Sequence, residues 1–169
     1  KMMLNPAKCV FGVPAGKLLG FLVSERGIVA NPGKIKAITS LAKPPCINDV
    51  QRLAGRILAL SRFISRLGEK AIPLYQMMKK TDHFVWSDAA DQTFEALKKQ
   101  LAEPPILAAT IDKEPLLLYL AANSQAVSVA IVVKRKEAGK EYPVQRPVYY
   151  ISEVLIESKR RYPHWQKLV

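Results

Sequence analysis

The stretch Leu116-Leu117-Leu118-Tyr119-Leu120 is a short apolar run of the kind that forms a β-strand. A turn is predicted at Asn123-Ser124-Gln125, and a second strand follows from Val127 to Val133. A charged turn then leads to a third strand from Pro147 to Ile151, and a helix is predicted to open near Tyr162. Three consecutive antiparallel strands followed by a helix predict the beginning of an α+β domain.

The segment before this sheet predicts a helix with a marked start and end. Phe84-Val85-Trp86 is an apolar anchor, and Ser87 is expected to cap the helix. The first turn contains Asp88 and Asp91, where carboxylates interact favourably with the helix dipole. Pro104-Pro105 ends the helix. Its core-facing positions are Phe94, Leu97 and Leu101.

Residues 47–80 are predicted to be helical. Asn48 is expected to be the N-cap, with Gln51 reaching back to it. Gly68 is expected to break the helical run, and a short further helix is predicted from Ile72 to Met78. The apolar residues that recur at helical spacing are Val50, Leu53, Ala54, Ile57 and Leu58.

Four arginines lie along this helical segment: Arg52, Arg56, Arg62 and Arg66. The first two are four residues apart and therefore share one helix face. Such a row of guanidinium groups suits the phosphate backbone of a nucleic acid. An exposed face without a partner explains the same pattern, and the sequence leaves both interpretations open.

The first thirty residues predict strands and turns. The runs Cys9-Val10-Phe11 and Leu18 to Val23 flank Pro14-Ala15-Gly16, which is predicted to be the turn of a hairpin. Gly20 is expected to be a bulge or a point of close backbone approach. A second turn is predicted at Glu25-Arg26-Gly27.

A helix-start signal follows at Asn31-Pro32, with the asparagine as N-cap and the proline at the first helical position. Lys43-Pro44-Pro45 is expected to end this helix. Its apolar face consists of Ile35, Ile38 and Leu41.

The composition bounds the class of protein. The 169 residues are 49% hydrophobic, which is enough to bury a core. The sequence has no run of 18 or more apolar residues and no signal-type segment at its start, so an intracellular protein of the cytoplasm or nucleus, without a membrane partner, is expected. Cys9 and Cys46 lack metal-ligand spacing and are predicted to be small buried hydrophobes.

The net charge of +12 is concentrated in the first half of the chain. Residues 1–80 contain 14 lysines and arginines against 3 acidic residues, whereas residues 81–169 contain 12 against 11. A basic surface of this kind suits a polyanion, and binding would release counterions and depend on salt. A solvated face that confers solubility is the alternative.

Other catalytic chemistry has little support in the sequence. His83 and His164 have no Ser or Cys partner in a recognisable motif, and no glycine-rich phosphate loop occurs. Asp82, Asp88 and Asp91 are interpreted as residues of a helix start rather than as metal ligands. Aromatic residues interpreted as core rather than as base-stacking platforms are Trp86, Trp165, Tyr149 and Tyr150.

Several sequence blocks, taken in their order, carry a resemblance to a known family. In the first half the blocks are Lys8-Cys9-Val10-Phe11, Leu18 to Ser24, Gly27-Ile28, Asn31 to Ile35, Leu53-Ala54-Gly55 and Arg62-Phe63-Ile64-Ser65. In the second half they are Phe84-Val85-Trp86, Phe94 to Lys98, Leu101, Pro104 to Leu107, Leu118-Tyr119 and Pro147 to Ser152. From about residue 4 to the end, this order resembles the polyproteins of gypsy-type LTR retrotransposons.

The resemblance implies four segments of a reverse transcriptase and its RNase H-like domain. Residues 1–45 match the end of the palm with a primer-grip-like hairpin, residues 46–81 the helical thumb, residues 82–110 a connector helix, and residues 111–169 the N-terminal half of the RNase H-like domain. The turn that holds the primer terminus in the family, and the thumb that packs on the template-primer duplex, imply nucleic-acid-binding residues. These are Leu18, Leu19, Gly20, Phe21, Arg52, Arg56, Arg62 and Arg66.

The catalytic carboxylates of the family do not carry over. Its polymerase uses an adjacent aspartate pair in a Tyr-Xaa-Asp-Asp turn, and no Asp-Asp pair occurs in this sequence. The first RNase H ligand for Mg²⁺ lies in a Thr-Asp-Ala-Ser pattern, which corresponds here to Leu120-Ala121-Ala122-Asn123. Positions where the family usually has glutamates match Lys159, Gln166 and Leu168. Because alanine and leucine offer no ligand and lysine repels a divalent ion, no metal, cofactor or catalytic residue is expected in this chain.

The function expected from the sequence is binding of an RNA–DNA hybrid or duplex by a fragment of such a polyprotein, with the rest of the polyprotein as a partner. The neighbouring Glu153 and Glu157 are too few to rebuild a metal site, so the chain alone is expected to be inactive. Two alternatives stay open. The full-length parent is an active RNA-directed DNA polymerase and ribonuclease H, or the second half is a structural scaffold that supports the thumb and binds a protein.

Overall fold

A computed structural model describes residues 3–79 and 83–168 of the chain. Within these residues the strands are β1 (Ala15–Leu18), β2 (Phe21–Ser24), β3 (Gly27–Ala30), β4 (Leu117–Ala122), β5 (Ala126–Arg135) and β6 (Val144–Val154). The α-helices are α1 (Pro32–Thr39), α2 (Ile47–Leu58), α3 (Leu67–Lys70), α4 (Ile72–Gln76), α5 (Asp88–Ala102) and α6 (Glu157–Arg160). The 3-10 helices are η1 (Pro6–Lys8), η2 (Ser61–Phe63) and η3 (His164–Lys167).

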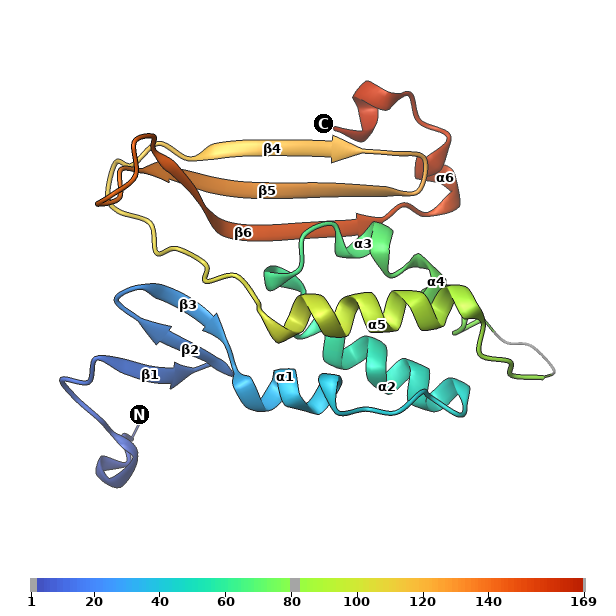
Figure 1. The fold of residues 1–169 in the computed structure, drawn as a ribbon, viewed down its shortest axis with the longest axis horizontal. Helices are drawn as coiled ribbons and strands as arrows, with labels where there is room; N and C mark the ends of the chain where they lie inside the picture. The colour runs from blue at the N-terminus through green and yellow to red at the C-terminus, as the bar shows by residue number, and fades with distance from the viewer. Residues whose placement is uncertain (1–2, 80–82, 169) are drawn as a thin grey trace.

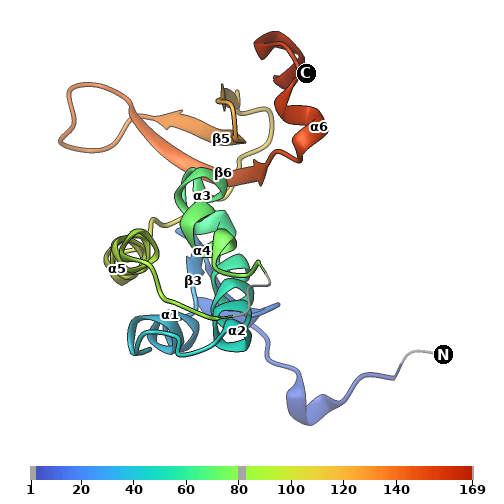
Figure 2. The ribbon, with the colours of Figure 1, turned by 90° about the vertical axis from the view of Figure 1, so that its right-hand side faces the viewer.

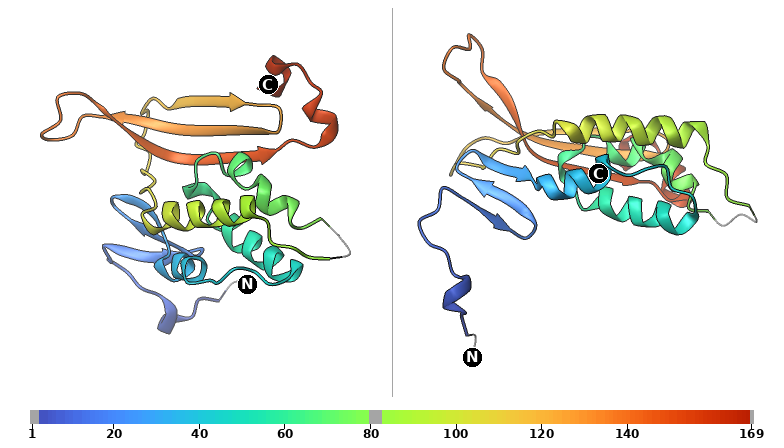
Figure 3. Two further views of the ribbon diagram at one scale, coloured as in Figure 1. Left: turned by 45° about the vertical axis from the view of Figure 1, so that its right-hand side comes forward. Right: turned by 60° about the horizontal axis from the view of Figure 1, so that its bottom comes forward.

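The strands form two separate antiparallel sheets. Sheet A has the order β1-β2-β3, and sheet B has the order β4-β5-β6. Helices α3, α4 and α5 lie below sheet B in Figure 1, and sheet A leads into α1 and α2 further down. Figure 2 shows that α3 lies against sheet B at β6, with α4 and α5 further from the sheet, and in Figure 3 the segment before β1 extends away from the rest. The α+β class with antiparallel sheets is confirmed.

The hairpin of sheet A turns at Leu19-Gly20, between the paired residues Leu18 and Phe21. Both turn residues have a positive φ, 49° and 81°, as the two-residue turns that suit twisted hairpins require. The turn expected at Pro14-Ala15-Gly16 is therefore wrong, and so is the single strand expected from Leu18 to Val23. The turn at Leu19 had only a weak signal in the sequence because a leucine rarely adopts a positive φ.

Gly20 is not a bulge, because β1 and β2 pair in an unbroken register. An added Cβ at this glycine would lie 2.6 Å from Lys34 Nζ, so the close approach expected here is made by a side chain and not by backbone. The second turn is confirmed, since Ser24 and Gly27 are paired across Glu25-Arg26.

Helix α1 begins as predicted at Asn31-Pro32. The Asn31 side-chain oxygen accepts a hydrogen bond from the Gly33 N–H at 2.9 Å, which satisfies a backbone donor of the first turn. The expected apolar residues pack as predicted, with Ile38 fully buried and Ile35 and Leu41 against the core. The helix ends at Thr39, so Leu41 lies beyond it and the end expected at Lys43-Pro44-Pro45 is wrong.

The N-cap of helix α2 is Cys46, two residues before the expected Asn48, so Asn48 lies inside the first turn and is not the N-cap. Four of the five apolar positions predicted to face the core are buried, whereas the side chain of Leu58 is 53% exposed. That residue lies at the last position of the helix, where the chain leaves for η2. The buried positions are Val50, Leu53, Ala54 and Ile57.

The helical break expected at Gly68 is wrong. The chain already leaves α2 at Leu58, and Gly68 lies buried inside α3. Its N–H donates to Ser152 Oγ of β6 at 2.8 Å, and an added Cβ would lie 2.7 Å from the same oxygen. The glycine therefore allows a helix to touch a strand of sheet B.

Helix α5 agrees with its prediction. The Ser87 hydroxyl oxygen accepts a hydrogen bond from the Ala90 N–H at 3.2 Å, and Asp88 and Asp91 occupy the first turn. The helix packs against α1 and α4, and it ends before the prolines that were expected to stop it. Its buried side chains include Phe94, Leu97 and Leu101.

Sheet B contains the three strands predicted from the sequence, each extended at one or both ends. Strand β4 continues through Ala122, so Ala121 lies within the strand, opposite Ser128, and not just past its end. The helix expected to open near Tyr162 is wrong. Helix α6 ends at Arg160, and the next helical turn, η3, starts only after Pro163, which lacks the N–H that a helix interior needs.

One hydrophobic core joins the first part of the chain (residues 3–79) to the second part (residues 83–168). It contains Phe63 from the first part and Phe94 from α5, together with Leu107 from the link to sheet B. This link pairs with β3 through Ile28 and Leu107, and the next residue, Ala108, donates its N–H to the Pro147 carbonyl of β6 at 2.7 Å. No helix in the described parts of the chain is long and apolar enough to cross a membrane.

Candidate nucleic-acid interface

A groove with basic walls lies between α1 and α2. Its volume is about 380 Å³. The small residues Ala37, Gly55 and Ala59 line it together with Lys34, Arg52 and Arg56. No atom lies within 4 Å of an added Cβ at Gly55, so the groove is open above this residue. We call these six residues the basic groove.

Two cations of the basic groove, Arg52 and Arg56, are held in place by hydrogen-bond or ion-pair partners. Arg56 NH1 donates to the Ala37 carbonyl of α1 at 3.0 Å, which ties the two helices together. Arg52 NH1 pairs with Asp49 at 3.0 Å in the preceding turn. Both arginines are exposed, so their remaining N–H groups face solvent.

The turn of sheet A lies beside this groove. Lys34, a residue of the groove, places its ammonium group against Gly20, as the distance from an added Cβ shows. The adjacent Leu19 side chain is 87% exposed, and Leu18 is also exposed. Phe21 is different, because its ring packs on the core 5.9 Å from the ring of Phe63.

The four arginines predicted as one row have three different environments. Arg52 and Arg56 line the basic groove. Arg62 lies with Cζ 4.4 Å from the ring centroid of Phe21 and 5.1 Å from that of Tyr149. Arg66 has a left-handed backbone with a φ of 57° and forms two hydrogen bonds of 2.8 Å with Glu69. The structure thus brings together Arg62 with Phe21, and Arg52 with Arg56.

Two residues of this region were missed by sequence reasoning. Lys34 follows the Asn31-Pro32 helix start, and its place in the first turn of α1 was a usable signal. The contact of Tyr149 with Arg62 had no local signal, because it depends on how sheet B packs on η2.

The position of the family's first metal ligand has no oxygen to offer. Ala121 lies opposite Ser128, which is opposite Ser152 of β6, and the two hydroxyl oxygens lie 2.9 Å apart. Glu153 is paired with Lys159 at 3.1 Å. Since Mg²⁺ is held through carboxylate oxygens, this set of side chains does not fit the ion. Among the residues with a described placement, no group of three His, Cys, Asp or Glu side chains could hold a metal.

The other residues considered as metal ligands have structural roles or positions that need no metal. Hydrogen bonds from Lys43 and Trp86 hold the pKa of Asp91 below its usual value, which agrees with a structural carboxylate. Gln166 is exposed in η3, and Leu168 is half-buried after it. Asp82 lies outside the described residues. The two cysteines are free and only half-buried, so the full burial expected for them is wrong.

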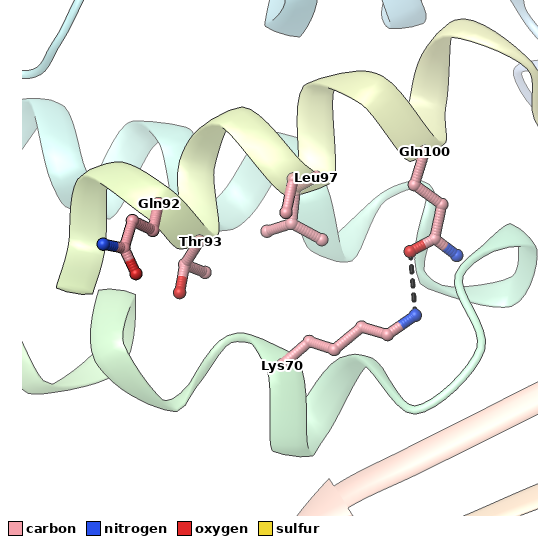
Figure 4. Close-up of a pocket in the computed structure, with 6 residues that line it drawn as sticks. Lys70, Gln92, Thr93, Leu97 and Gln100 are labelled. Atoms are coloured by element: carbon pink, nitrogen blue, oxygen red, sulfur yellow. Dashed lines mark hydrogen bonds between the residues drawn. The ribbon is translucent and has the colours of Figure 1, made fainter.

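A second polar groove, of about 410 Å³, lies between α5 and the segment of α3 and α4 (Figure 4). Lys70 extends along it and donates to Gln100 Oε1 at 2.9 Å, while Gln92 and Thr93 point into the same space. Burial lowers the pKa of Lys70, and the charge of Arg66 lowers it further. None of the residues of this groove belongs to the basic groove.

Residues 86–169 match the family model of the RNase H-like domain found in reverse transcriptase. The match begins at Trp86 and therefore includes α5 as well as sheet B. This part of the chain is similar to the RNase H-like domains of reverse transcriptases.

Relatives extend the similarity to the first part of the chain. Over 143 residues, 85% of the chain, it is 27% identical to the Transposon Tf2-3 and Tf2-4 polyproteins of Schizosaccharomyces pombe (strain 972). The match covers 11% of each relative, so the chain spans about a tenth of the length of these curated relatives. Over most of its length, the chain is similar to retrotransposon polyproteins.

Solved structures show the same fold. The chain is similar to a foamy viral protease-reverse transcriptase in complex with RNA/DNA hybrid, with a TM-score of 0.72 and 18% identity over 92% of this chain and 20% of that one. A second structure of that protein, in complex with dsDNA, gives a TM-score of 0.70 and 18% identity over 91% of this chain and 31% of that one.

Proposed function

We propose that the chain is a nucleic-acid-binding part of a gypsy-type reverse transcriptase and RNase H polyprotein, and that it holds an RNA–DNA hybrid or duplex without cutting or extending it. The observation that carries this proposal is the basic groove beside the exposed Leu19-Gly20 turn. In this proposal residues 1–45 are the end of the palm, residues 46–81 are the thumb, and residues 82–110 connect them to the rest of the RNase H-like domain.

The geometry of the basic groove suits a phosphate backbone. Four residues of helix separate Arg52 from Arg56, which is about 6 Å along the axis. The charges of one DNA strand repeat about every 3.4 Å along the duplex axis, so two arginines at this spacing can each meet a phosphate of the same strand. The small side chains of Ala37, Gly55 and Ala59 leave room for the backbone to approach between them.

The similar solved structures support this proposal, since the foamy viral protein was solved with dsDNA and with an RNA/DNA hybrid. Contacts to phosphates position a nucleic acid without reading its sequence. We therefore expect weak sequence preference. The rest of the polyprotein is the second partner in this proposal.

Titration of a labelled RNA–DNA hybrid at two salt concentrations tests the proposal. Affinity is expected to fall with salt, with a slope of about −0.9 for each phosphate neutralised. The triple variant Lys34→Gln, Arg52→Gln and Arg56→Gln is expected to weaken binding and to reduce the salt slope by about 3. Salt-independent or undetectable binding by the unmodified chain contradicts the proposal.

A matched control removes the same charge elsewhere. Lys134, Lys136 and Lys140 are exposed around the turn between β5 and β6, away from α1 and α2. Their replacement by glutamine is expected to leave hybrid affinity nearly unchanged. An equal loss in both triple variants would mean that net charge, and not the basic groove, governs binding.

The absence of catalysis is a separate part of the proposal. It is supported by the side chains at Ala121, Ser128 and Ser152, which offer no carboxylate. Incubation of the chain with a hybrid and Mg²⁺ is expected to leave the RNA strand intact. Degradation that stops on addition of a chelator would overturn this part and leave the binding result standing.

A scaffold function is the second candidate, and the packing of sheet B on α3 favours it. The hydrogen bond from Gly68 to Ser152 and the burial of Ser128 fix the sheet against the helices. The test is the simultaneous replacement of Arg52, Arg56, Arg62 and Arg66. If hybrid affinity were unchanged, the better assignment would be a scaffold that supports the helical segment and binds a protein partner.

A further inference from the structure

Two cations converge on the ring of Phe21 at the start of β2. Lys34 Nζ lies 5.3 Å from the ring centroid, and Arg62 Cζ lies 4.4 Å from it. The ring is itself fixed by its contact with Phe63 in the core. Because an aromatic face attracts cations, Phe21 holds both charges close to the Leu19-Gly20 turn.

Neither cation has an acidic partner. Within the described residues, Lys34 and Arg62 form no hydrogen bond and no ion pair, in contrast to Arg52 with Asp49 and Arg66 with Glu69. The ammonium group therefore keeps three N–H donors and the guanidinium group five. Two like charges near one ring repel each other, and a bound anion would reduce this cost.

We propose that Lys34 and Arg62 form a phosphate-binding site at the edge of Phe21, and that Arg62 couples this site to the RNase H-like domain. A phosphate oxygen would accept N–H donors from both cations, as charge-assisted hydrogen bonds require. The bound group is a backbone phosphodiester of the nucleic acid, and that assignment rests on the proposed function. A free phosphate has the same oxyanion chemistry.

Gly20 provides the space that this site needs. Its φ of 81° is a conformation that side chains rarely adopt, and an added Cβ would lie 2.6 Å from Lys34 Nζ. A side chain here would displace the ammonium group as well as strain the turn. The glycine thus keeps the turn open beside Lys34, where a ligand held by the turn would meet the charge.

Arg62 connects the site to sheet B. Its guanidinium Cζ lies near the ring of Tyr149 as well as that of Phe21, and Tyr149 belongs to β6 of the RNase H-like domain. A planar guanidinium can stack on rings and still present N–H groups at its edge. A phosphate bound at that edge would fix Arg62 and, through it, the position of β6.

The test uses the full chain and an RNA–DNA hybrid. Hybrid affinity is measured for Lys34→Met, Arg62→Met, Arg62→Lys and Tyr149→Leu, with Lys36→Met as the control because Lys36 is exposed on the same helix as Lys34. Hydrogen exchange of the β6 amides is followed with and without hybrid. Urea unfolding of each variant verifies that it is folded.

The two methionine variants are expected to lose about tenfold in hybrid affinity, since one charge-assisted hydrogen bond is worth roughly that factor. Lys36→Met is expected to lose far less. Arg62→Lys and Tyr149→Leu are expected to bind within about threefold of the unmodified chain but to lose the protection of β6 that the hybrid produces, because the planar bridge is gone.

Inorganic phosphate, compared with chloride at equal ionic strength, distinguishes the source of the oxyanion. Protection of β6 by the hybrid alone identifies a phosphodiester, and protection by inorganic phosphate as well identifies a site open to free phosphate. Salt-dependent hybrid binding that Lys34→Met and Arg62→Met weaken no more than Lys36→Met does would overturn the site while the proposed function stands. If the chain binds no hybrid, the proposed function fails, and the site stands only if inorganic phosphate protects β6 in the unmodified chain and not in Arg62→Met.

Discussion

Sheet A and sheet B are both three-stranded and antiparallel, but they are stabilised in different ways. Every residue of β1 is exposed, and the strands of sheet A have four residues each, whereas β5 and β6 have 10 and 11 residues and β5 contains buried residues. Sheet A is held mainly by its neighbours, through the Ile28–Leu107 bridge and the packing of Phe21 on Phe63. The turn of sheet A is exposed at Leu18 and Leu19, whereas sheet B has the longer strands.

The largest expected effect on the free energy of unfolding comes from Phe94→Ala. This variant tests whether the part of the chain with sheet A and the part with sheet B unfold together. Phe94 is fully buried in α5, yet its core also contains residues of the first part of the chain. Loss of a buried phenylalanine is expected to cost about 3–5 kcal/mol. Urea unfolding followed by Trp86 fluorescence and by hydrogen exchange of β5 and of α2 should shift by the same free energy. Separate shifts would show two independent units.

A pair of glycine variants compares the packed contact of α3 with sheet B, at Gly68, with the open groove beside α2, at Gly55. An alanine Cβ at Gly68 would lie 2.7 Å from Ser152 Oγ and 3.1 Å from the Glu153 carbonyl carbon, so Gly68→Ala is expected to destabilise the chain by about 1–3 kcal/mol. Gly55 has open space, and Gly55→Ala is expected to stabilise α2 by about 0.5–1 kcal/mol. Chemical denaturation measures both. Opposite signs support the assigned packing, and equal signs contradict it.

Gly55→Ala also tests the basic groove. Its added methyl group would narrow the groove, so hybrid affinity is expected to fall although the fold becomes more stable. Affinity that rises with stability would place the nucleic acid elsewhere.

Helix caps give a smaller effect in the second region. Ser87→Ala removes the acceptor for the Ala90 N–H and is expected to cost about 1 kcal/mol. Asn48→Ala is the control, because Asn48 lies inside α2 and caps nothing. Thermal unfolding should separate the two variants. A larger loss for Asn48→Ala would reject the observed start of α2.

The smallest expected effect concerns acid stability of the link to sheet B. Hydrogen bonds from Arg135 hold the pKa of Glu114 below its usual value. Because the folded pKa is depressed, the stabilisation is present above the ordinary glutamate pKa of about 4.3 and is lost as the pH falls through the folded value. Glu114→Gln should make stability less dependent on pH in this range, as measured by urea midpoints. An unchanged pH profile would remove the role of this pair.

The elements that the sequence predicted well are those with local causes. Asn31 and Ser87 are capping residues followed by apolar stripes, so both helix starts followed from nearby residues. The hairpin turn did not, because Leu19 adopts a conformation that its residue type disfavours. Gly68 was predicted as a break because its partner, Ser152, is far along the chain.

The candidate site divides in the same way. The pairing of Arg52 and Arg56 on one face follows from helical spacing. The position of Arg62 near the rings of both Phe21 and Tyr149 depends on the tertiary fold. The pairing of Arg66 with Glu69 is local, three residues along the chain, and accompanies the left-handed backbone of Arg66. The nucleic-acid role of all eight predicted residues and the four predicted segments stay predictions.

The position of α5 has a consequence for inheritance. This helix begins two residues after the start of the RNase H-like match at Trp86, but its buried side chains complete a core to which α1 and α4 contribute. The family model therefore matches only residues 86–169, whereas the residues that must stay compatible in one core lie on both sides of Trp86. If two related chains exchanged the segments that follow Trp86, each new segment would bring its own residue at the position of Phe94. The residues before Trp86 that pack against this position would have to match it.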